Sequence, residues 1–143
     1  MTLRVREAEP GDLEAMTDLV GQLGYPSEES AVAGRLERLA ADPTSWVYVA
    51  VDDGRVVGVG ALHVMPVLER DDPTARITAM VVDEGARRGG VGRALLDRLE
   101  ETARAEGCAR MYLTTRYERE GAVAFYRRMG FEDTSLRFVK DLG

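Results

Sequence analysis

A glycine-rich turn between a β-branched segment and a helical segment constrains this chain more than any other feature. The turn runs from Arg87 to Arg93, has glycines at 89, 90 and 92, and follows the apolar run 75–82. Glycines let the chain approach a ligand closely and present successive backbone N–H groups. At the start of a helix, those N–H groups and the helix dipole favour an anion. We therefore predict a strand–turn–helix unit that binds a phosphate or a pyrophosphate.

The rest of the chain predicts a sheet with helices packed on it. Apolar residues recur at helical spacing in four segments, over 13–23, 32–39, 95–103 and 122–129. Alternating or β-branched runs predict strands at 3–6, 46–51, 56–65, 75–82, 110–115 and 136–139. The Asp53-Gly54 pair predicts a hairpin between the second and third of these strands, because such a turn needs positive φ angles. The order of elements specifies an α/β domain with a mixed sheet.

Length and composition narrow the class of protein. A chain of 143 residues without internal repeats or a linker fits one domain, 1–143. The single cysteine, Cys108, excludes an internal disulfide and a cysteine-rich metal cluster, and we expect no metal. The net charge of −6 disfavours nucleic-acid binding, which needs a basic face. The N-terminus is charged and no apolar run approaches about 18 residues, so we expect a cytoplasmic protein without a membrane partner.

The glycine-rich turn differs from two common phosphate-binding loops. It lacks the Lys-Ser or Lys-Thr pair of the P-loop, and it does not fit the Gly-x-Gly-x-x-Gly motif of dinucleotide-binding domains. It does match Arg-x-x-Gly-x-Gly through Arg87, Gly90 and Gly92. That pattern resembles the acetyl-CoA pyrophosphate loop of the GNAT acetyltransferase superfamily. A glycine-rich turn without a ligand is the simpler alternative.

A second motif extends the resemblance to the C-terminal part of the chain. The segment Ala122–Phe131 matches the GNAT signature Ala-x-x-Phe-Tyr-x-x-x-Gly-Phe, and Arg6–Leu13 is similar to the common start of the family. The two main motifs occur in the family's order and cover nearly the whole chain. The resemblance implies the GNAT fold, an α/β (α+β) domain with a central mixed, mostly antiparallel, twisted sheet. About four helices are expected to flank that sheet.

The resemblance also implies which residues bind acetyl-CoA, the expected co-substrate. Pantetheine would bind the main chain at the end of the predicted fourth strand, formed by Met80, Val81 and Val82. The pyrophosphate would lie in the loop formed by Arg87, Arg88, Gly89, Gly90, Val91, Gly92 and Arg93. Many members carry an Asn where this chain has Arg119. Arg119 is therefore either a contact to a CoA phosphate or a solvent-facing side chain.

Tyr126 is the residue that the resemblance assigns to general acid catalysis. A thiol with a pKa near 8.5 leaves more readily if a protonated donor lies within reach, and a phenol with a pKa near 10 is protonated at neutral pH. The alternative is an aromatic packing residue. The base is less defined, because Arg76 stands where several members place a Glu. His63, Glu69, Glu120 and a water relayed by backbone carbonyls are the candidates, and His63 has the most suitable intrinsic pKa.

Together these features predict an acyltransferase that moves the acetyl group of acetyl-CoA directly to a primary amine of a small molecule. Two alternatives stay open. One is an N-acetyltransferase acting on a protein or peptide amine, and the other is a non-catalytic acyl-CoA-binding sensor. Family members often dimerise, so a homodimer is a candidate assembly. The sequence does not identify the acceptor amine, the general base or the oligomeric state.

Overall fold

The computed structural model describes residues 2–116 and 120–143. The chain divides into two compact units, Met1–Met111 and Tyr112–Gly143, and each unit is described by itself. The first unit holds most of the sheet and the glycine-rich loop. The second holds the Ala122–Phe131 motif.

Five strands form one sheet in the order β1-β2-β3-β4-β5. Their bounds are Leu3–Glu7 for β1, Ser45–Asp52 for β2, Arg55–Met65 for β3, Thr74–Val82 for β4 and Met111–Tyr112 for β5. The three pairs from β1 to β4 are antiparallel. The predicted hairpin is present between β2 and β3, where Asp53 and Gly54 both have positive φ angles, 49° and 79°. The predicted fold class, an α/β domain with a mixed, mostly antiparallel sheet and about four flanking helices, is confirmed, with five of the six predicted strands and four α-helices in the described residues.

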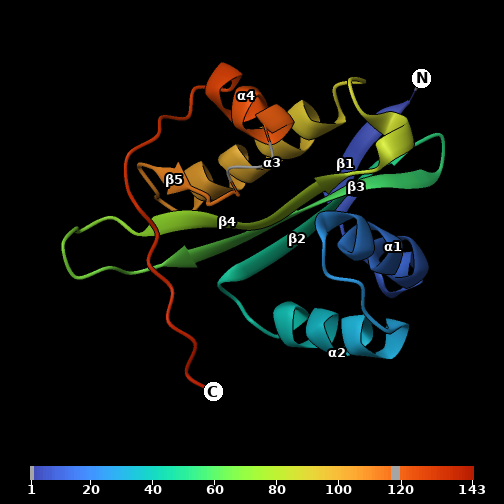
Figure 1. The fold of residues 1–143 in the computed structure, drawn as a ribbon, viewed down its shortest axis with the longest axis horizontal. Coiled ribbons are helices and arrows are strands. Elements are labelled where there is room, and N and C mark those ends of the chain that lie inside the picture. The colour runs from blue at the N-terminus through green and yellow to red at the C-terminus, as the bar shows by residue number, and fades with distance from the viewer. Residues whose placement is uncertain (1, 117–119) are drawn as a thin grey trace. The chain divides into compact units, whose positions relative to one another are not determined.

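The helices of the first unit cover both faces of the sheet. A short 3-10 turn, η1 (Pro10–Asp12), leads into α1 (Leu13–Leu23), which is followed by α2 (Glu29–Ala40). A second turn, η2 (Glu84–Ala86), precedes α3 (Val91–Ala105). Figure 1 shows α3 on one face of the sheet, with α1 and α2 on the other. In the part of the chain that the structure describes, no helix is long and apolar enough to cross a membrane.

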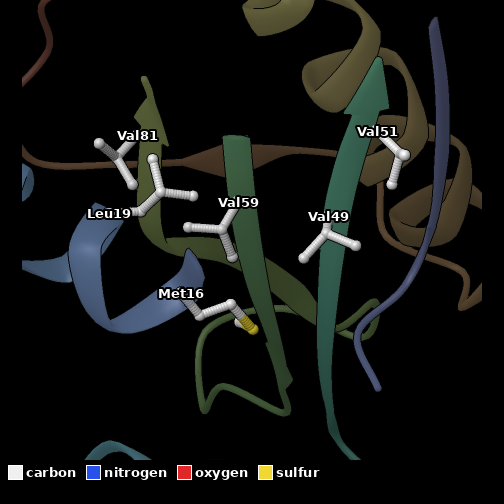
Figure 2. Close-up of a cluster of buried hydrophobic side chains, with 6 residues drawn as sticks. All are labelled: Met16, Leu19, Val49, Val51, Val59 and Val81. Carbon is white, nitrogen blue, oxygen red and sulfur yellow. The ribbon is translucent and has the colours of Figure 1, made fainter. Parts of the chain in front are cut away.

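The α1 face holds a compact apolar cluster. Val49, Val59 and Val81 lie opposite one another on β2, β3 and β4, and α1 adds Met16 and Leu19 above them. Figure 2 shows these side chains, together with Val51, along α1 and the three strands. All are buried, and full burial of such a side chain stabilises the fold by about 1.5–3 kcal/mol. This cluster fixes α1 against the middle of β3 and the end of β4.

On the face of the sheet that α3 covers, two glycines of β3 let the helix lie close to the strand. A Cβ atom at Gly58 would lie 3.0 Å from methyl groups of both Val91 and Leu95. A Cβ atom at Gly60 would lie 3.2 Å from a methyl group of Leu99. Because neither strand residue has a side chain, the apolar stripe of α3 packs directly on the backbone of β3. This packing sets the distance between α3 and the sheet. It therefore also sets the position of the N-terminus of α3.

The second unit contains α4 (Glu120–Arg128) and a C-terminal segment without helix or strand. The helix ends as predicted, with Gly130 at a φ of 94°. The strand predicted at 136–139 is wrong, and the side chains of Leu136, Phe138 and Val139 are 72%, 89% and 72% exposed. A strand needs a neighbour to pair its N–H and C=O groups, and the described residues of this unit offer only Tyr112 of β5. The strand predicted at 110–115 is likewise reduced to Met111–Tyr112.

We expect Gly58→Ala to destabilise the fold by about 1–3 kcal/mol, the usual cost of overpacking a filled core. The new methyl group would meet Val91, Leu95 and the backbone oxygen of Val81, 3.2 Å away, which cannot turn aside as a side chain can. Urea unfolding followed by circular dichroism measures the change. Gly21→Ala is the control, because no atom lies within 4 Å of its Cβ position on α1 and alanine favours a helix. Equal stability of Gly58→Ala and wild type would contradict the close packing.

Candidate functional site

The loop between β4 and α3 has backbone φ angles that residues other than glycine rarely adopt. Arg88 has a φ of 68°, and Gly90, the residue before α3, has a φ of 82°. Glycine adopts such angles without the steric cost that a side chain carries. Residues 87–90 are exposed, and no atom lies within 4 Å of the Cβ position of Gly90. The loop therefore leaves open space beside its own backbone.

The amides of residues 88–93 are the main chemical feature of this loop. Among the described residues, none of them donates to another backbone group or to a side chain, and the first bond of the helix runs from the Ala94 amide to the Gly90 oxygen. The first turn of α3 carries no acidic side chain that would compete for them. Unpaired N–H groups at the start of a 15-residue helix form a site for an anion. The predicted phosphate-binding geometry is thus available in the backbone.

A polar clip that the sequence does not predict holds the start of the loop. Asp83 accepts hydrogen bonds from Gln22 Nε2 at 2.7 Å and from Arg55 at 2.8 Å, while the Glu84 amide donates to Gln22 at 3.0 Å. The Gln22 hydrogen bond and the charge of Arg55 lower the pKa of Asp83 below its usual value. The clip joins the ends of α1, β3 and β4. A conspicuous acidic residue directly before the turn was the only signal for it in the sequence.

The strand before the loop contains a bulge. Ala79 lies opposite Ala61, but Ile77 lies opposite Leu62, so Thr78 is an extra residue in β4 and its side chain is exposed. Bulges bend a strand, interrupt its pairing and are frequent beside active sites. β5 has two residues against nine in β4, so it can pair with only a short part of that strand. Much of the outer edge of β4 is therefore without a neighbouring strand in the described part of the chain.

The residues predicted to bind pantetheine follow the bulge directly. Met80 and Val82 lie opposite Gly60 and Gly58, the two glycines beneath α3, and both are half-buried. Val81 faces the α1 cluster and is buried. Arg87 turns back, so that its Nε donates to the Val82 oxygen at 3.3 Å. The end of β4 and the unpaired amides of residues 88–93 are thus joined by a short, hydrogen-bonded segment.

His63, the predicted base, lies on β3 beside two hydroxyl groups. Its Nδ1 is 3.4 Å from both Thr44 Oγ1 and Ser45 Oγ. Both hydroxyls bind Asp42, at 2.7 and 2.9 Å, and together with the Thr44 amide they lower the pKa of Asp42 to about 2. His63 thus lies beside a fixed acidic group.

Tyr126 belongs to the second unit. Its ring makes edge contacts with Phe125 and Phe131, with ring centres 5.3 and 5.6 Å away, and the Phe131 amide donates to its backbone oxygen at 3.0 Å. These contacts fix the ring on the last turn of α4. Arg119, the predicted phosphate contact, lies outside the described residues. No group of three or more His, Cys, Asp or Glu side chains within 2–116 and 120–143 is arranged to hold a metal ion.

Comparison with known proteins defines the class. The model of the acetyltransferase (GNAT) family matches residues 13–131. An IAA acetyltransferase of Azospirillum brasilense is 34% identical over 85% of this chain and 74% of its own length. A glucosamine 6-phosphate N-acetyltransferase of Trypanosoma brucei brucei is 31% identical over 98% of this chain and 96% of its own. A GNAT family acetyltransferase of Staphylococcus aureus, at 23% identity, shares the fold with a TM-score of 0.85 over 99% of this chain and 100% of its own.

The chain therefore belongs to the GNAT acetyltransferase family. It is an acyltransferase, as the resemblance of its loop and its Ala122–Phe131 motif implied.

We expect Asp83→Ala to loosen the loop without unfolding the sheet. The change removes the acceptor for both Gln22 and Arg55, and a charged hydrogen bond in this half-exposed setting contributes about 1 kcal/mol. Hydrogen exchange of the Glu84 and Ala86 amides, the two hydrogen-bonded amides at the start of the loop, should become about fivefold faster when followed by NMR. Asp18→Ala is the control, because it removes only the exposed bond of the same Gln22. Equal exchange in wild type and Asp83→Ala would mean that the clip does not hold the loop.

Proposed function

We propose that this protein transfers the acetyl group of acetyl-CoA to a primary amine of a small molecule. The single observation that carries the proposal is the set of unpaired amides at residues 88–93, at the start of α3, in a chain of the GNAT family. An anion of the size of a pyrophosphate accepts several such bonds at once, whereas a single carboxylate uses fewer.

The residues of the first unit fit acetyl-CoA. The amides of Arg88 to Arg93 hold the pyrophosphate, and the backbone of Met80 and Val82, on either side of Val81, binds pantetheine at the unpaired edge of β4. The side chain of Arg87 closes the end of that strand through its bond to Val82. Acetyl-CoA supplies an acetyl group activated as a thioester, so no nucleophilic side chain is needed on the protein.

Two side chains of this chain move the protons. Tyr126 donates its phenolic proton to the sulfur that leaves, and the ring is already fixed by Phe125 and Phe131. His63 accepts the proton that the attacking amine loses, directly or through a water. A water relayed by backbone carbonyls serves the same purpose if His63 acts only in positioning.

A small-molecule acceptor is favoured over a peptide. The Trypanosoma relative is named for glucosamine 6-phosphate, a small amine, and it aligns with almost the whole of this chain. Acetylation of peptide N-termini or lysines in preference to small amines would support the alternative instead. Binding of acetyl-CoA without turnover on any amine would support the acyl-CoA sensor.

We expect Tyr126→Phe to slow the acetyl-transfer step by about 10²–10⁴-fold, the usual contribution of a general acid. The change removes one hydroxyl and keeps the ring, so the contacts with Phe125 and Phe131 remain. Acetyl-CoA affinity should stay close to that of wild type, because the proposed contacts are backbone groups elsewhere. Single-turnover measurements, on the best acceptor found by screening amines for CoA-thiol release, separate the chemical step from product release.

Tyr112→Phe is the matched control, because it removes a phenolic hydroxyl from the same unit and should leave the rate unchanged. A wild-type single-turnover rate in Tyr126→Phe would identify Tyr126 as a packing residue and overturn its role as the acid.

A further inference from the structure

A row of polar side chains crosses three strands on the face that α1 covers. Ser45 on β2 lies opposite His63 on β3, and His63 lies opposite Arg76 on β4. Residues directly opposite in antiparallel strands point to the same side of the sheet. Ser45 is four residues before Val49, so by the alternation of the strand the row shares a face with the α1 cluster. Three polar residues thus stand side by side on the face that carries the α1 cluster.

The β4 end of this row holds two buried polar atoms without partners. Arg76 Nε and Thr74 Oγ1 are both inaccessible to solvent, and neither has a hydrogen-bond partner among the described residues. Thr74 is itself only 4% exposed. The two residues are two positions apart on one strand, so they point to the same side. A buried polar group without a partner destabilises the fold, and a bound ligand that supplies the partner removes that cost.

The β2 end of the row is held by hydrogen bonds within the protein. The hydroxyls of Thr44 and Ser45 direct their hydrogens to the two oxygens of Asp42. Their oxygens are left to accept from His63 Nδ1, 3.4 Å from each. With Nδ1 directed at these hydroxyls, Nε2 keeps the role proposed above for His63. The groups left to donate to an anion are the guanidinium of Arg76 and the hydroxyl of Thr74.

The β4 member of the row, Arg76, lies on the same strand as the residues proposed to bind pantetheine. If the pyrophosphate lies at 88–93 and pantetheine at 80–82, the acetyl group lies toward the bulge at Thr78. Arg76 is two residues further along, about 7 Å at the usual rise of a strand. An acceptor amine at the bulge would therefore place a group some 7 Å away beside Arg76.

We infer that the β4 end of this row, the guanidinium of Arg76 with the Thr74 hydroxyl, binds an anionic group on the acceptor. The inference rests on the proposed function. It assigns the acceptor to amines that carry a phosphate, phosphonate or carboxylate a few bonds from the nitrogen. Guanidinium groups pair with such oxyanions through two parallel hydrogen bonds, which fixes the orientation of the acceptor as well as its affinity.

Matched pairs of amines test the inference. Glucosamine 6-phosphate is compared with glucosamine, 2-aminoethylphosphonate with ethanolamine, and β-alanine with its amide, each at saturating acetyl-CoA. In at least one pair the anionic member should have the higher kcat/KM, and Arg76→Met should lower that value by about 10–100-fold, the range of a lost charged hydrogen bond. The kcat/KM of the neutral member and the KM of acetyl-CoA should change less than twofold. Arg76→Lys should restore part of the loss.

Arg38→Met is the control variant, because it removes one exposed positive charge from α2 and should alter no acceptor. Equal kcat/KM for both members of every pair, or an equal loss for both in Arg76→Met, would overturn the anion site. Circular dichroism of each variant verifies that the fold is retained.

A binding measurement separates failure of the anion site from failure of the proposed function. His63 is the only histidine, so its ring signals in an NMR spectrum are unambiguous. Titration with methylphosphonate should shift them in wild type and not in Arg76→Met. If no amine is acetylated, the proposed function fails, and this titration still decides the anion site. An absent shift, or the same shift in Arg76→Met, would overturn it.

Discussion

The contact between α3 and the backbone of β3 determines the rest of the site. Gly58 and Gly60 let the helix lie so close to the strand that a methyl group at either position would be crowded. Since α3 is anchored there by Val91, Leu95 and Leu99, its first turn lies directly beyond the end of β4. The glycine-rich loop has only to connect the two, and its amides remain unpaired. Packing at the centre of the domain thus creates the anion-binding backbone at its edge.

Two further features, the Asp83 clip and the bulge at Thr78, give the site a donor side and an acceptor side. The Asp83 clip ties the start of the loop to α1 and β3, so the loop is held at both ends. The bulge at Thr78 divides β4 into a part that faces the loop and a part that faces the polar row of Ser45, His63 and Arg76. In our account the acetyl donor occupies the first part and the acceptor the second, with the transferred group between them.

The sequence predicted the features that depend on neighbouring residues. The turn at Asp53-Gly54, the loop at 87–93 and the helix end at Gly130 follow from local backbone requirements, and all three are present. The clip was missed because Gln22 and Asp83 are 61 positions apart, and the polar row depends on strand register. The alternating segment 136–139 was wrongly predicted as a strand, because alternation does not supply a pairing partner. For the site, the sequence predicted which residues take part, but it did not predict which residues from other strands and helices lie beside them.

The central claim is that the amides of residues 88–93 hold the pyrophosphate of acetyl-CoA. The most direct test is a titration of ¹⁵N-labelled protein with CoA, followed by backbone NMR, with pantetheine as the ligand that lacks the pyrophosphate. The account predicts that CoA shifts the amide protons of 88–93 downfield, as expected for new hydrogen bonds to an anion, and that pantetheine leaves them in place. CoA binding that shifts other residues while these amides stay unchanged would contradict it.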